Sequence, residues 1–256
     1  MIPSLPLRVL TQSTFEAKFR ACERNMKTVG IIGGVGPEST IEYYRFIIEA
    51  YRERKQDDTY PSIIINSVDV NKYVALATAN RFDAFADELV IEIARLANAG
   101  ADFGALAANT PHIVFDELQN RSSIPLVSIV EATCDKARDL GLKRVALLGT
   151  RFTMSGGFYQ DVFARSGIDL VVPNGEEQAY IHEKYIGELL KNVFTDETRA
   201  GLLAIIDQLR ERDAVDGVIL GGTELPLILR DSESEGVTFL DTTKIHVEKI
   251  VERLLS

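Results

Sequence analysis

The feature that most constrains the fold is a regular alternation of short apolar segments with longer segments of helical periodicity. The first apolar segment, VGIIGG at residues 29–34, ends in a glycine turn, and Ile41, Tyr44, Ile48 and Tyr51 then recur at helical spacing. Further apolar segments lie at 61–66, 103–107, 124–128, 145–149 and 218–220, and helical patterns lie at 82–96, 130–140, 157–166, 176–192, 196–212 and 247–254, with one more beginning at Pro111. Because helices that alternate with buried strands cover both faces of a parallel sheet, the sequence predicts an α/β fold.

The two halves of the chain resemble each other. VGIIGG near the start is similar to VALLGT at 145–150, and ADFGALAANTPH at 101–112 is similar to VDGVILGGTELP at 215–226. This repetition predicts two pseudo-symmetric α/β lobes, each a parallel sheet flanked by helices, with a cleft between them. We expect the first lobe at 26–125 plus 229–256 and the second at 126–228, with residues 1–25 as an N-terminal extension.

Charge and composition exclude several classes of partner. The 256 residues carry 28 basic and 38 acidic side chains, a net charge of −10. Nucleic-acid and anionic membrane surfaces need a basic patch, so neither is predicted as a partner. Two cysteines are too few for a disulfide scaffold, no His-x-x-x-His or Cys-x-x-Cys spacing indicates a metal site, and the N-terminus lacks the apolar core of a secretory signal. We therefore expect a cytoplasmic protein that handles a small molecule.

Four loops at strand ends carry the residues that could bind a ligand. They lie at 33–40, 107–112, 149–159 and 221–226. The first loop lacks the third glycine of a dinucleotide fingerprint, and the lysine of a phosphate-binding P-loop is absent. Each loop also fits a simple helix cap or tight turn, so a structural and a ligand-binding interpretation both stay open for each.

The four loops taken together resemble the aspartate/glutamate racemase family. The resemblance runs from Met26 to the C-terminus. It is carried by five ordered motifs: GIIGGVGPEST at 30–40, AANTPH at 107–112, GTRFTMSGGFY at 149–159, GGTELP at 221–226 and DTTKIHVE at 241–248. It implies two pseudo-symmetric lobes, a homodimer, an active site in the cleft, and amino-acid racemisation without pyridoxal phosphate or metal.

The resemblance also implies two catalytic cysteines, one from each lobe, that face the substrate Cα from opposite sides and exchange its proton. Ala108 and Gly222 stand at those two positions in this chain. Cys22 precedes the matching region, and Cys134 lies inside a predicted helix, where a buried structural thiol is expected. The standard two-cysteine mechanism is therefore not possible here.

The rest of the binding frame is retained in part. By the resemblance, the substrate contacts fall on Val35, Asn109, Thr110, Thr153, Thr223 and Glu224. The nearest candidates for another acid or base are Glu224, Thr110, Thr223 and His112. Members that bind acidic substrates place basic or amide groups where Ala77 and Ala179 or Tyr180 align, which favours a neutral or apolar substrate side chain, with His182 and Lys184 close by.

Two functions follow from these observations. The first is a cofactor-independent amino-acid racemase or related isomerase that uses groups other than thiols, because the frame is retained. The second is a catalytically impaired protein that binds an amino acid or small carboxylate, because loss of both thiols removes the mechanism. Exchange of the substrate α proton distinguishes the two.

Overall fold

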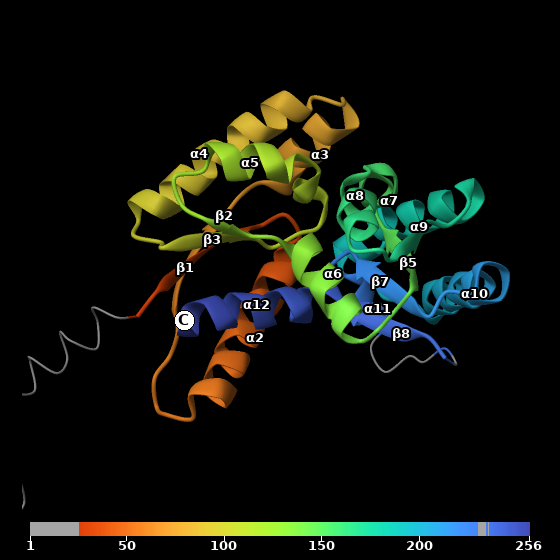
Figure 1. Ribbon diagram of the computed structural model, residues 1–256. Helices are drawn as coiled ribbons and strands as arrows, with labels where there is room; N and C mark the ends of the chain where they lie inside the picture. Colours follow the sequence, from red (N-terminus) through yellow and green to blue (C-terminus); the bar gives the residue numbers. More distant parts are fainter. Residues whose placement is uncertain (1–25, 230–233, 235) are drawn as a thin grey trace, which may run out of the picture.

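The computed structural model describes residues 26–229, 234 and 236–256, which form two four-stranded parallel sheets. The first sheet has the order β2-β1-β3-β4, and the second has the order β6-β5-β7-β8. The strands are β1 (Thr28–Gly33), β2 (Ser62–Ser67), β3 (Phe103–Leu106), β4 (Leu126–Val127), β5 (Arg144–Gly149), β6 (Asp169–Val171), β7 (Gly217–Gly221) and β8 (Thr238–Asp241). The same relative order in both sheets confirms the predicted two-lobe α/β fold (Figure 1).

Helices cover both faces of each sheet, as expected for parallel strands. The helices are α2 (Pro37–Lys55), α3 (Val70–Thr78), α4 (Phe82–Asn98), α5 (Phe115–Arg121), α6 (Ile129–Asp139), α7 (Arg151–Ser155), α8 (Phe158–Arg165), α9 (Gly175–Gly187), α10 (Asp196–Asp213), α11 (Leu225–Ile228) and α12 (Thr242–Leu255), with 3₁₀ turns η1 (Thr110–Val114) and η2 (Leu189–Lys191). In the first lobe α2 and α12 share one core, and α3, α4 and α5 share the other. In the second lobe α9 and α10 lie on one face, and α6 and α8 on the other.

The apolar periodicity of each helix decides which face is buried. In α4 the side chains of Phe85, Leu89, Ile93 and Leu96 are at most 1% exposed. Their spacing of three or four residues places them on one stripe against the sheet. Full burial of each such side chain stabilises the fold by about 1.5–3 kcal/mol.

The sheets divide the chain differently from the predicted lobe boundaries. β4, expected in the second lobe, pairs with β3 and continues the first sheet. β8, expected in the first lobe, pairs with β7 and completes the second sheet. β4 was predicted within the segment 124–128 but has only two residues and is followed closely by α6, and β8 has only four residues and was not predicted, so neither strand marks the end of its four-stranded unit clearly.

Helix α12 joins the two lobes. It packs against α2 of the first lobe and against α6, and it also touches strands of both sheets. Val247, Ile250, Val251 and Leu254 fill the first-lobe core, whereas Ile245 enters the second-lobe core. The predicted extension 1–25, with Cys22, lies outside the described residues. Over the described ranges, none of the helices has the length and apolarity needed to cross a membrane.

Candidate active site

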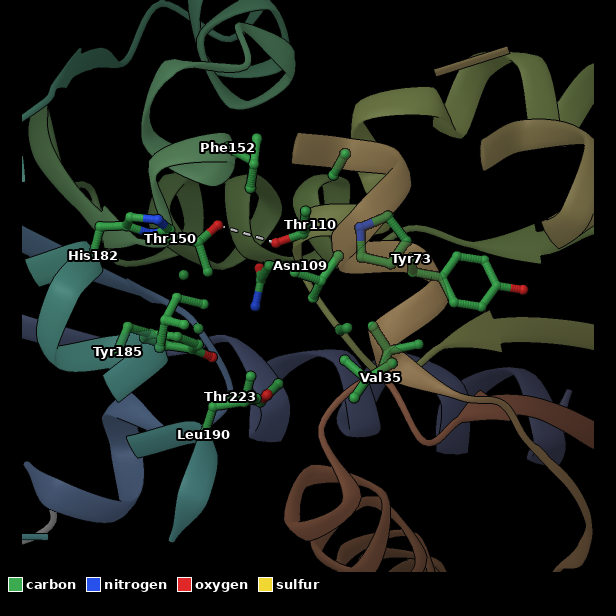
Figure 2. A pocket seen from close by; sticks show the side chains of 18 of the residues that line it. Val35, Tyr73, Asn109, Thr110, Thr150, Phe152, His182, Tyr185, Leu190 and Thr223 are labelled. Atoms are coloured by element: carbon green, nitrogen blue, oxygen red, sulfur yellow. Dashed lines mark hydrogen bonds between the residues drawn. The ribbon is translucent and has the colours of Figure 1, made fainter. Parts of the chain in front are cut away.

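A pocket lies between the lobes at the carboxyl ends of the central strands. The loops after β3 (108–111) and after β7 (221–223) form its floor. The first lobe contributes the side chains of Val35, Val70, Tyr73, Val74, Ala77 and Phe85, and the second contributes those of Thr150, Phe152, His182, Tyr185, Ile186 and Leu190 (Figure 2). Ligands of parallel α/β sheets bind at this edge, so the geometry matches a binding site.

The glycine loop after β1 brings Val35 to the pocket. Gly34 and Gly36 have φ values of 82° and 118°, a region that favours glycine. A Cβ on Gly36 would lie 2.7 Å from Oε1 of Glu224 and 2.8 Å from Oγ of Ser39. The loop therefore needs these glycines so that the N-terminus of α2 can approach the second lobe.

Asn109 is held in one orientation by both ends of its amide. Its Oδ1 accepts a hydrogen bond of 2.6 Å from the hydroxyl of Tyr159, and its Nδ2 donates one of 3.1 Å to Oγ1 of Thr242. Thr242 in turn donates to the carbonyl of Leu220 at the end of β7. Because Nδ2 has a second hydrogen, Asn109 still has a donor for a ligand in the pocket that it lines.

Three threonine hydroxyls meet where the lobes touch. Thr110 of the first lobe lies 3.1 Å from Thr150 and 3.3 Å from Thr153 of the second, measured between Oγ1 atoms (Figure 2 shows the first pair). Thr110 and Thr150 line the pocket. Thr153, predicted as a substrate contact, is fully buried one layer behind them and supports them.

Glu224 is also one layer behind the pocket wall, although the sequence predicts it as a substrate contact. It is 2% exposed. Its Oε1 accepts a hydrogen bond of 3.0 Å from Ser39 of α2, and its Oε2 accepts from the hydroxyls of Thr223, at 3.0 Å, and Tyr185. The carboxylate therefore joins the two lobes through three hydroxyl donors.

Tyr185 on α9 is a functional candidate that the sequence analysis missed. The Tyr185 side chain fills the space that a side chain at position 222 would need. A Cβ on Gly222 would lie 2.7 Å from the Tyr185 hydroxyl oxygen and 2.8 Å from Cζ of its ring. Burial, followed by the charge of Glu224, raises the pKa of Tyr185 well above its ordinary value, so the phenol stays protonated. Only the glycine at 222, where the family resemblance implies cysteine, could have indicated that another residue fills this position.

His112 has both ring nitrogens engaged by the backbone. Its Nε2 accepts a hydrogen bond of 3.1 Å from the N–H of Ile129, so the ring proton lies on Nδ1, 3.0 Å from the carbonyl of Ala108. Burial, with a smaller contribution from His246, lowers the pKa of His112 to about 3. His112 lies outside the pocket lining and fixes the Ala108 backbone, which gives its proposed acid–base role no geometric support.

The residues aligned with side-chain recognition separate in the structure. Ala77 and His182 line the pocket, whereas neither Ala179 nor Tyr180 is among its lining residues. Lys184 points to Glu188 instead, with 2.5 Å between Nζ and Oε1. Nδ1 of His182 accepts from the N–H of Arg151, and burial lowers the pKa of His182, which is therefore a neutral donor through Nε2.

Cation ligands are sparse around the pocket. Within the ranges that the structure describes, no group of three or more histidine, cysteine, aspartate or glutamate side chains is placed to hold a metal ion. The described lining residues include neither lysine nor arginine. The pocket thus offers hydroxyls, an amide, one imidazole and a wide apolar wall.

Comparison with known proteins places this pocket in a recognised fold. The family described as Asp/Glu/hydantoin racemase matches residues 32–250. The chain is 25% identical to the broad specificity amino-acid racemase RacX of Bacillus subtilis over 231 residues, covering 89% of this chain and 98% of that protein. It is 35% identical to an aspartate racemase homologue from Pyrococcus horikoshii, with a TM-score of 0.77 over 90% of this chain and 100% of that one. The Picrophilus torridus aspartate racemase, 23% identical with a TM-score of 0.72 over 89% and 94% of the two chains, shares the fold.

Proposed function

The chain belongs to the Asp/Glu/hydantoin racemase family, and from this we propose that it acts on a small amino acid or related carboxylic acid with an uncharged side chain. In this proposal it is a cofactor-independent racemase or related isomerase whose proton-transferring groups are not thiols. A relative that is named as a broad specificity amino-acid racemase supports the substrate class.

The observation that carries the proposal is the division of the pocket into a polar floor and an apolar wall. Asn109, Thr110, Thr150 and Thr223 supply neutral hydrogen-bonding groups where the lobes meet, which suits a carboxylate and an ammonium group. Across the pocket the wall is built from aliphatic and aromatic side chains. Each Å² of apolar ligand surface buried there favours binding by about 25 cal/mol.

The same wall disfavours acidic substrates. A second carboxylate placed against it would lose water without gaining a cation, because neither lysine nor arginine is among the described lining residues. We therefore expect aspartate and glutamate to bind more weakly than leucine or phenylalanine. This expectation separates the chain from the acid-specific members that its family name suggests.

The test is α-proton exchange. Both enantiomers of alanine, valine, leucine, methionine, phenylalanine, aspartate and glutamate are incubated with the protein in D₂O, and loss of the α-proton signal is followed by NMR. Exchange with at least one uncharged amino acid, and none with the acidic pair, is the expected result.

Thr110→Val should weaken binding of the amino acid that exchanges about tenfold, since it removes a hydrogen bond to a charged group of the ligand. Thr238→Val, at the exposed first residue of β8 and outside the pocket lining, is the matched control without effect.

A second function is favoured by Ala108 and Gly222. Neither residue can accept or donate a proton through a side chain, and a protein with this pocket would still bind its ligand. Binding of an uncharged amino acid by calorimetry, with no exchange for any amino acid of the panel, would establish this second function and exclude the first.

The assembly and location of the protein stay predictions. The resemblance predicts a homodimer, and α2 presents Ile41 and Tyr44 at 60% and 50% exposure, which suits an interface between copies. Light scattering after size exclusion tests the dimer. Fractionation of the source cells tests the cytoplasmic location.

A further inference from the structure

We propose that Tyr185, backed by the carboxylate of Glu224, is the proton-transferring group of this pocket and that it acts on one face of the substrate only. The inference rests on the substrate class and the α-proton chemistry of the proposed function but not on racemisation, because a single protic face moves a proton on and off one side of Cα. It predicts exchange with retention of configuration rather than racemisation.

The position of Tyr185 is the first support. Its ring and hydroxyl fill the space that a side chain at 222 would take, so a phenol stands where the second lobe would otherwise present residue 222 to the ligand. Figure 2 shows the Tyr185 hydroxyl directed towards Thr223 on the pocket floor. The glycine at position 222, where the family resemblance implies cysteine, and the placement of the Tyr185 ring therefore depend on each other.

The surroundings of Glu224 are the second support. Its described partners are the hydroxyls of Ser39, Thr223 and Tyr185, all of which donate to it. None of the ion pairs found among the described residues involves Glu224, and its three hydrogen-bond donors are neutral hydroxyls. Oε2 of Glu224 accepts the hydrogen bond of the Tyr185 hydroxyl, so the phenolic proton has a direct path to the carboxylate.

Among the residues that the structure describes, the opposite face of the pocket has no equivalent. Ala108 ends in a methyl group, and the ring of His112 behind it is fully engaged by the backbone. Tyr73 lines the wall, but its hydroxyl points away from the other labelled side chains in Figure 2. Asn109 and Thr110 are neutral groups that suit binding.

The proposed step conserves protons and electrons. The Tyr185 oxygen takes the substrate α proton while its own phenolic proton passes to Oε2 of Glu224. The electron pair of the broken C–H bond stays on the substrate as an enolate, whose oxygens are stabilised by the Thr110 and Thr150 hydroxyls and the Asn109 amide. Reversal returns a proton, or a deuteron from solvent, to the same face.

The experiment compares the two enantiomers of each uncharged amino acid of the panel in D₂O, with α-proton loss read by NMR and configuration by chiral chromatography. One enantiomer should exchange and keep its configuration. Tyr185→Phe should slow exchange at saturating ligand by about 100-fold or more, the usual contribution of a positioned acid or base, while the ligand Kd stays unchanged. Glu224→Gln should show the same split. Tyr180→Phe, on the same helix but away from the pocket, is the matched control.

The outcomes separate the inference from the proposed function. Comparable exchange of both enantiomers, inversion of configuration, or full exchange in Tyr185→Phe would overturn the inference and leave the proposed function standing. Absence of exchange in the unmodified protein for every amino acid would overturn the proposed function itself.

Discussion

The two lobes share one strand order but present different chemistry to the pocket. The first lobe lines it with the neutral polar groups of Asn109 and Thr110 and with a wall that includes Val35, Val70, Val74, Ala77 and Phe85, and Ala108 stands at its family thiol position. The second lobe also adds apolar side chains at Phe152, Ile186 and Leu190, but it presents Thr150, His182 and Tyr185 as well, with Glu224 directly behind. Strand order therefore persists where the side chains at the pocket differ, so pseudo-symmetry of the fold does not imply pseudo-symmetry of the proposed proton transfer.

The largest expected effect concerns the buried histidines His112 and His246, which lie outside the pocket lining, whereas His182 of the second lobe lines the pocket. Burial lowers the pKa of His112 to about 3 and that of His246 to about 4. The unfolded chain binds these protons near pH 6.5, whereas the folded protein does not. As the pH falls from 6.5 towards 4, each histidine should therefore lower the free energy of unfolding by up to about 1.4 kcal/mol per pH unit. Urea denaturation at half-unit pH steps measures this slope.

The control for this prediction is His182, the pocket histidine of the second lobe. His182→Asn should retain the part of the slope that comes from the two fully buried histidines and lose only the contribution of His182, whose pKa burial also lowers. His246→Asn should be less stable at pH 7, because the ring lies between Tyr43 and the carbonyl of Val127, but its slope should be shallower. An unchanged slope in His246→Asn would contradict the attribution of part of the slope to the lowered pKa of His246.

The second prediction compares the two positions of the missing thiols. Gly222→Cys forces a Cβ into the Tyr185 ring, and overpacking of this kind costs about 1–3 kcal/mol of stability. Ala108→Cys adds one sulfur to a side chain that already borders the pocket, and should cost less than about 1 kcal/mol. Midpoints of urea denaturation give both values.

A double variant shows whether the cost at 222 arises from Tyr185. Tyr185→Leu makes room for the new side chain, so Gly222→Cys should destabilise this background less than it destabilises the unmodified protein. Equal costs in the two backgrounds would mean that the tyrosine is not what excludes a side chain from position 222.

The sequence predicted the fold more completely than the site. Strong apolar segments such as 29–34 and 145–149 revealed the central strands, because buried parallel strands are apolar on both faces. The short strands β6 and β8 and helix α3 carry weaker patterns and were not predicted, whereas β4 was predicted as part of 124–128. The lobe boundaries predicted from these patterns place β4 and β8 apart from the strands with which they pair. Motif loops located Val35, Asn109, Thr110 and Thr223 in the pocket. Tyr185 lies 37 residues before Gly222, and only packing brings the two together.

A smaller effect is expected from changing the apolar wall of the first lobe. Val74 lines the pocket and is 37% exposed, so arginine can be placed there at little cost to folding. Val74→Arg supplies the cation that an acidic side chain lacks, and the affinity for aspartate relative to leucine should rise about tenfold. Ile91→Arg, 50% exposed on α4 and outside the pocket lining, is the matched control. Equal ratios in the two variants would show that Val74 does not face the ligand.

The smallest expected effect is that of thiol alkylation. Cys134 is 2% exposed, and burial raises the pKa of its thiol, so little reactive thiolate forms. Iodoacetamide should therefore leave ligand binding and α-proton exchange unchanged, since no thiol among the described residues lines the pocket. Ala108→Cys places a thiol on the first-lobe face and should become sensitive to the reagent, whereas Cys134→Ala should behave as the unmodified protein. Sensitivity of ligand binding to iodoacetamide in the unmodified protein and in Cys134→Ala, but not in Cys22→Ser, would contradict this prediction and show that alkylation of Cys22 affects the site.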